Sequence, residues 1–104
     1  MNENTENVRQ YPELVISNTR FYPASKNGNT LAYVTVELNG VFVLHDLRIV
    51  QGKNGLFVAM SQKEIKGEYK DMCHPSTREY RGKFCGEILD RYEEYLERGN
   101  ADAD

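Results

Sequence analysis

A histidine and an aspartate are adjacent at His45-Asp46, the first pair in the chain whose residue types could do catalysis. Adjacent residues of a β-strand point to opposite faces of a sheet, so these two side chains cannot form a dyad with each other. In the hairpin that we expect here, His45 faces apolar Val34, which favours a hydrogen-bonded core histidine over a general base. Asp46 is expected to form a structural ion pair with Arg48, across or along the sheet.

Residue types that bind metals occur further along the chain, at Asp71, Cys73, His74 and Cys85. Their spacing matches no paired zinc site, and Cys85 falls on an apolar helical stripe, where a buried thiol acts as a small hydrophobic group. We find no Gly-rich phosphate loop, nucleophile elbow or paired-carboxylate pattern. We therefore expect no enzymatic activity, no metal and no cofactor.

Basic residues concentrate in the middle of the chain, although the formal net charge is -3. Residues 20–83 carry ten basic and six acidic side chains, whereas residues 1–19 and 84–104 are both acidic. Tyr69 and Tyr80 lie among the cations and could stack on unpaired bases, although Tyr80 also fits a buried helical stripe. The alternative is a solvated face of scattered charges. Six cations fall within 21 residues, around the expected last hairpin and the first turns of the expected helix, and are predicted to form one phosphate-binding patch: Lys63, Lys66, Lys70, Arg78, Arg81 and Lys83.

The size and composition restrict the class of protein. A chain of 104 residues and 12.0 kDa, 39% hydrophobic and 28% charged, is typical of one folded domain. No apolar run approaches the roughly 18 to 20 residues that span a bilayer, and the N-terminus is polar and acidic, unlike a signal peptide. Two cysteines are too few for a disulfide scaffold. We expect a cytoplasmic domain at residues 14–98, a poorly ordered acidic arm at 1–13 and a disordered acidic tail at 99–104.

Turn signals and alternation predict four strands in meander order. Asn39-Gly40 between alternating apolar residues is a strong hairpin signal, and a two-residue turn there would set Leu38 against Val41 and Ala32 against Leu47. A first strand is expected over residues 14–22, a fourth over 56–60, and a short fifth over 68–74 that ends before Pro75.

The C-terminal part predicts one long amphipathic helix. Ser76 and Glu79 form a capping-box pattern, and apolar residues recur at helical spacing from Tyr80 to Leu96. The helix is expected from Thr77 to about Arg98. The fold class is therefore α+β: a curved antiparallel sheet of four to five strands with one C-terminal helix.

One helix covers only one face of such a sheet, which leaves the other face for a partner. Four apolar residues are expected there, and we predict that they form a homodimer interface: Tyr33, Phe42, Leu44 and Val50. Burial of that face across a two-fold axis and pairing of edge strands are both open as modes of dimerisation.

Several stretches together resemble the SpoVG family of stage V sporulation proteins. The resemblance is carried by LHDLRIV at residues 44–50, NGLFVAM at 54–60, GEYKD at 67–71 and His74-Pro75, and it covers about residues 14–92. It implies a small homodimer with a curved antiparallel sheet and a C-terminal helix. It also implies a bacterial regulator linked to septation, sporulation or gene expression, with DNA and RNA bound by basic residues near the end of the sheet and the start of the helix. The chain departs from the family at Ser61, where proline is usual, and at Glu64 and Glu79, which dilute the basic segment.

These observations predict a homodimeric nucleic-acid-binding regulator with weak sequence selectivity. The alternative is a protein-interaction module that works without nucleic acid, which the overall acidity and the acidic second half of the helix favour. Neither hypothesis requires a membrane or a small-molecule substrate.

Overall fold

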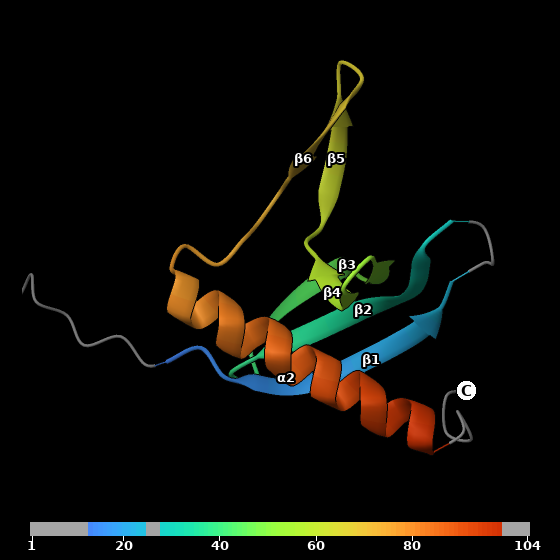
Figure 1. Ribbon diagram of the computed structural model, residues 1–104. Coiled ribbons are helices and arrows are strands. Elements are labelled where there is room, and N and C mark those ends of the chain that lie inside the picture. The colour runs from blue at the N-terminus through green and yellow to red at the C-terminus, as the bar shows by residue number, and fades with distance from the viewer. Residues whose placement is uncertain (1–12, 25–27, 99–104) are drawn as a thin grey trace, which may run out of the picture.

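The computed structural model describes residues 13–24 and 28–98. Four antiparallel strands form an open sheet in meander order, and a second sheet has two strands (Figure 1). The predicted α+β class is confirmed. The expected fifth strand, however, does not extend the main sheet, because it pairs in a separate hairpin that projects from the body of the molecule. The elements are β1 (Ile16–Pro23), β2 (Thr30–Leu38), β3 (Phe42–Gly52), β4 (Gly55–Ala59), β5 (Gln62–Ile65), β6 (Glu68–Asp71) and α2 (Arg78–Glu97).

Helix α2 covers one face of the four-stranded sheet and packs against β1 and β4. Its buried stripe is Phe84, Ile88, Tyr92 and Tyr95, as the helical periodicity predicts. The ring of Phe21 on β1 lies 5.4 Å from that of Tyr92 and 5.1 Å from that of Tyr95, so one aromatic cluster joins the helix to the sheet. Within residues 13–24 and 28–98, no helix lies over the other face of the sheet, which we call the helix-free face.

The helix begins one residue later than the capping-box pattern predicts. Thr77 is the N-cap, in an extended conformation, and its hydroxyl accepts a hydrogen bond of 3.1 Å from the backbone N–H of Tyr80. The assignment of Ser76 as the cap is therefore wrong. The expected tail at 99–104 lies outside the described residues, as does the expected arm except for Glu13.

The β2–β3 hairpin has a different register from the one that the sequence predicts. Three residues form the turn, so Leu38 pairs with Phe42 instead of Val41, and Val36 pairs with Leu44. Asp46 then adopts a φ of 68° at a β-bulge, which brings Leu47 opposite Val34 and returns the strand to its buried alternation.

This register corrects the predicted place of His45. The histidine is exposed on the helix-free face instead of facing Val34 in the core, and its Nδ1 lies 3.5 Å from the Thr35 hydroxyl. Leu44, expected on the helix-free face, packs instead against the core.

Candidate nucleic-acid interface

The six predicted phosphate-binding cations are all exposed, but they lie on two separate elements. Lys63 and Lys70 are cross-strand partners in the β5–β6 hairpin, and Lys66 follows in its turn with a φ of 53°. Cross-strand partners share a face, so Lys63 and Lys70 present their ammonium groups on the same side of the hairpin. The hairpin is therefore a projecting arm that carries three lysines (Figure 1).

The other three cations lie at the start of α2. Arg78 and Arg81 are exposed in its first turns, where the helix dipole adds partial positive charge. Lys83 forms an ion pair with Glu13, and this hydrogen bond and charge raise the pKa of the Lys83 ammonium group above its ordinary value. An extended segment, residues 72–77, connects the two groups.

Ion pairs with glutamates divide the six cations into paired and unpaired ones. Lys70 lies 3.1 Å from a carboxylate oxygen of Glu68, so it is paired, as Lys83 is. Within residues 13–24 and 28–98, the remaining four cations form no ion pair: Lys63, Lys66, Arg78 and Arg81. The structure thus leaves two free cations on the hairpin and two at the helix start.

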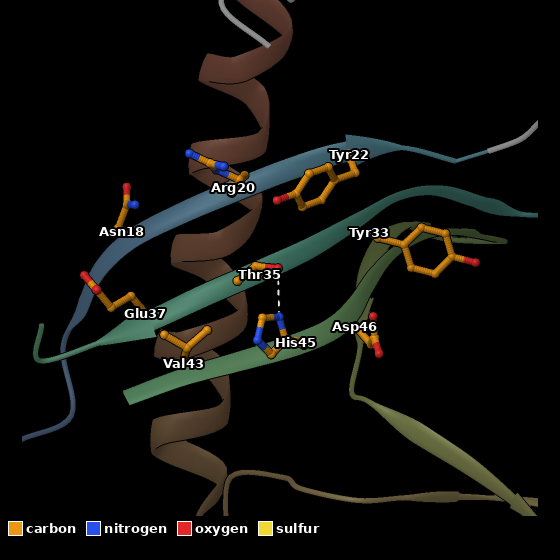
Figure 2. A pocket seen from close by; sticks show the side chains of 9 residues that line it. All are labelled: Asn18, Arg20, Tyr22, Tyr33, Thr35, Glu37, Val43, His45 and Asp46. Atoms are coloured by element: carbon orange, nitrogen blue, oxygen red, sulfur yellow. Dashed lines mark hydrogen bonds between the residues drawn. The ribbon is translucent and has the colours of Figure 1, made fainter. Parts of the chain in front are cut away.

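The helix-free face of the sheet holds Tyr33, as the sequence analysis predicts, together with polar and aromatic groups that it missed. Figure 2 shows Arg20, Tyr22 and Tyr33 on this face, with the helix behind the sheet. They line a hollow of about 430 Å³ together with His45 and Asp46. Strand alternation could have predicted that these side chains share a face. Tyr22 and Tyr33 are cross-strand partners, and Arg20 is two residues from Tyr22 on the same strand.

The expected ion pair between Asp46 and Arg48 does not form. The Arg48 guanidinium instead donates hydrogen bonds to the Thr30 hydroxyl at 3.1 Å and to the Gln62 side-chain oxygen at 3.2 Å. Asp46 makes neither an ion pair nor a side-chain hydrogen bond with another described residue. Arg48 therefore ties the main sheet to the β5–β6 hairpin.

The four residues predicted for the dimer interface lie on two different surfaces. Tyr33 is on the helix-free face, and Val50 lies two positions beyond Arg48 on β3, with Thr30 and Phe57 as its strand partners. Phe42 and Leu44 instead line a hollow of about 460 Å³ beside the start of the helix. These four residues therefore do not form one continuous patch.

The two cysteines are free thiols, both half-buried. Burial raises the pKa of the Cys85 thiol, against a smaller opposing effect of the nearby Arg81 charge. Among the described residues, no three His, Cys, Asp or Glu side chains come together as a possible metal site. None of their helices is long and apolar enough to cross a membrane.

The fold and the exposed groups define a small α+β protein with free cations on a hairpin and a helix start. Over residues 14–94 the sequence matches the SpoVG family, and the chain belongs to this family. It is 43% identical over 79 residues to a protein of Clostridium novyi, covering 75% of this chain and 79% of that protein. It is 40% identical over 83 residues to one of Clostridium botulinum, covering 79% and 91%, and 35% identical over 85 residues to one of Caldicellulosiruptor saccharolyticus, covering 81% and 97%. All three relatives are named SpoVG and provisionally described as septation proteins.

Proposed function

We propose that this protein is a homodimeric regulator that binds DNA or RNA with weak sequence selectivity and acts in septation, sporulation or gene expression. The observation that carries the proposal is the set of four exposed cations without an acidic partner among the described residues. Lysine and arginine side chains bind the phosphates of a nucleic acid whatever its base sequence, which gives affinity without base discrimination. The names of the SpoVG relatives support the link to septation.

Electrostatic binding of this kind has a measurable signature. Each phosphate neutralised by a cation contributes about -0.9 to the slope of log affinity against log salt concentration on duplex DNA. Four free cations in each subunit of a dimer would give a slope of up to about -7. Steep salt dependence with little change between duplex sequences is therefore the expected behaviour.

The test compares two double variants with the same change in net charge. Arg78→Ala with Arg81→Ala removes two free cations per subunit, and we expect the slope to flatten by about 3 to 4 for the dimer. Lys70→Ala with Lys83→Ala removes two cations that glutamates already neutralise, so the slope should change by less than about 1. Fluorescence anisotropy with a labelled duplex measures both. Equal effects of the two variants would refute this site.

Exposed apolar side chains support the homodimer. On the helix-free face and its flanks, Tyr22, Leu31 and Phe57 are all exposed, and β1 and β4 leave their outer edges unpaired within the main sheet. Such surface is commonly buried by self-association. Sedimentation equilibrium from micromolar to submillimolar concentration should show twice the chain mass. A monomer mass at every concentration would contradict this part of the proposal.

A protein-interaction module is the second candidate, because the second half of α2 presents exposed acids. Asp90, Glu93, Glu94 and Glu97 all lie on its surface. An acidic surface of this kind suits a basic protein partner and repels nucleic acid. If no DNA or RNA probe binds even at low ionic strength, where electrostatic association is strongest, this function replaces the first.

A further inference from the structure

A notch of about 560 Å³ lies where the β5–β6 hairpin meets the helix-free face of the main sheet. Two tyrosines from different elements line it, Tyr33 on β2 and Tyr69 on β6, and their side chains are 42% and 68% exposed. Neither ring contacts another aromatic ring within the part of the chain that the structure describes. Both rings therefore offer their faces to a flat partner from outside.

The remaining walls of the notch are polar, and one of them is held in place. Arg48 is fixed by its bonds to Thr30 and Gln62, and the Gln62 amide in turn donates to an Asp71 oxygen at 2.9 Å. This chain of hydrogen bonds positions the guanidinium between the sheet and the hairpin. A fixed guanidinium loses little conformational entropy when it binds a ligand.

Asp46 is the other charged group of the notch. The bulge places it at the same end of the helix-free face as Tyr33 (Figure 2), and its carboxylate has no side-chain partner among the described residues. An ionised carboxylate accepts hydrogen bonds and donates none. The notch thus combines two flat apolar faces with one fixed donor and one free acceptor.

We propose that this notch binds one unpaired nucleobase of a single-stranded nucleic acid, stacked on Tyr33 and Tyr69. This inference rests on the proposed function and adds a second, base-contacting site to the phosphate-binding cations. Stacking on aromatic side chains is how proteins hold unpaired bases, whereas bases in a duplex are already stacked and paired. The notch therefore favours single strands over duplexes.

The two charged groups select among the bases. Guanine presents acceptors at O6 and N7, which suit the Arg48 guanidinium, and an amino donor at N2, which suits the Asp46 carboxylate. Thymine and uracil have no amino group, so they leave Asp46 without an amino donor. We expect guanine to be preferred over thymine and uracil.

A second copy of this chain is the competing occupant of the notch. The cores of protein interfaces are depleted of charged residues, and the core of a homodimer interface is mostly apolar. Here Asp46, Arg48 and Gln62 form three of the five lining residues. Dimerisation over this surface would bury both charged groups without a partner for the carboxylate, which is costly. The lining therefore favours a base over a protein.

The test uses three labelled probes: a thymine 12-mer, the same strand with central guanines, and a duplex. Tyr69→Ala and Tyr33→Ala should each weaken single-strand binding about tenfold and leave duplex binding unchanged. Asp46→Gly, which tolerates the positive φ and removes the carboxylate, should abolish the preference for the guanine strand with little effect on the thymine strand. Leu96→Ala is the control, because its side chain is 48% exposed in the last turns of α2 and does not line the notch.

The outcomes separate this inference from the proposed function. Tyrosine variants that bind single strands normally, while Arg78→Ala with Arg81→Ala still weakens binding, overturn the notch and leave the phosphate site standing. Equal losses on single strands and duplex, together with a monomer mass for Tyr69→Ala in sedimentation, show that the notch is covered by a second copy and also overturn it. No binding of any probe by the unaltered protein overturns both proposals.

Discussion

Asp46 lies at the β-bulge that sets the register of the central hairpin. Its replacement by valine tests whether the left-handed backbone conformation at this bulge costs stability. The residue has a φ of 68°, in the left-handed region, and the bulge there restores the alternation that buries Leu47 and Ile49. Asparagine and aspartate tolerate this conformation, whereas a β-branched side chain does not. Asp46→Val must therefore either keep a strained backbone or lose the bulge.

The structure decides between these two outcomes. Without the bulge, a one-residue slip would turn Leu47 and Ile49, both fully buried, toward solvent, which costs about 1.5 to 3 kcal/mol for each side chain. The left-handed strain costs only about 1 to 2 kcal/mol. We expect valine to keep the register and to lower the free energy of unfolding by about 1 to 2 kcal/mol. For a domain of this size the melting temperature should fall by roughly 4 to 16 °C.

Three control variants isolate the backbone effect. Asp46→Asn and Asp46→Gly both tolerate a positive φ, so their unfolding free energies should lie within about 1 kcal/mol of the parent value. His45→Val introduces the same side chain at the exposed neighbouring residue, where φ is not positive, and should be nearly neutral. Urea unfolding followed by circular dichroism, at one fixed protein concentration, measures all four. If valine at 46 costs no more than asparagine, residue 46 does not carry the left-handed backbone strain that this reasoning requires.

Two further predictions concern the core beneath the helix. Ile88→Ala should lower the free energy of unfolding by about 2 to 5 kcal/mol, because Ile88 is fully buried between α2 and the sheet. Leu96 is 48% exposed on the same helix, so Leu96→Ala should lower it by about 0.5 kcal/mol or less. Thermal melts of the two variants measure the difference. Burial raises the pKa of the Tyr92 hydroxyl above its ordinary value of 10.0, so the folded state holds this proton more tightly than the unfolded state. The stability that this proton contributes is complete below pH 10 and is lost as the pH rises through the folded-state pKa. The urea concentration at the unfolding midpoint should therefore fall between pH 9 and pH 12. In Tyr92→Phe, which has no hydroxyl to ionise, the fall should be smaller.

Local patterns predicted the helix well because its signals lie within a few residues of one another. The stripe from Phe84 to Tyr95 follows helical periodicity, and its burial against β1 and β4 follows from amphipathicity. The cap was misassigned because Ser76 and Thr77 both carry hydroxyls. Only the path of the chain determines which of them reaches the N–H of Tyr80.

The hairpin register could not be predicted, because contacts from outside the hairpin help to fix it. The side-chain oxygen of Asn39 accepts a hydrogen bond of 2.7 Å from the N–H of Val15, and the N–H of Gly40 donates to the hydroxyl of Ser17 at 2.8 Å. The two contacts join the turn to β1 and to the residue before it, more than 20 residues away in the sequence. A two-residue turn was the natural expectation from Asn39-Gly40 alone, and the error carried over to His45 and Leu44.

The same reason limits what the sequence says of the interface. Charge counting found the six cations, but the partner of Lys83 is Glu13, 70 residues away. It also could not place Arg48 between the two sheets, because Gln62 belongs to β5, a strand that the meander prediction did not include. The sequence therefore predicts which cations are candidates for the site, and the fold determines which of them are free.

The charge order along α2 runs against the stability of the helix. Acids stabilise the positive N-terminal end of a helix and cations the negative C-terminal end, each by about 0.3 to 1 kcal/mol. Here Arg78 and Arg81 stand in the first turns together with the acid Glu79, whereas the last turn includes Glu97 and its only nearby cation is the C-cap Arg98. Local conflicts with stability concentrate where function requires them. A phosphate bound at this end would be attracted by the two arginines and the dipole together, and it would relieve their repulsion. The two arginines in the first turns are therefore consistent with the phosphate site that we propose at the helix start.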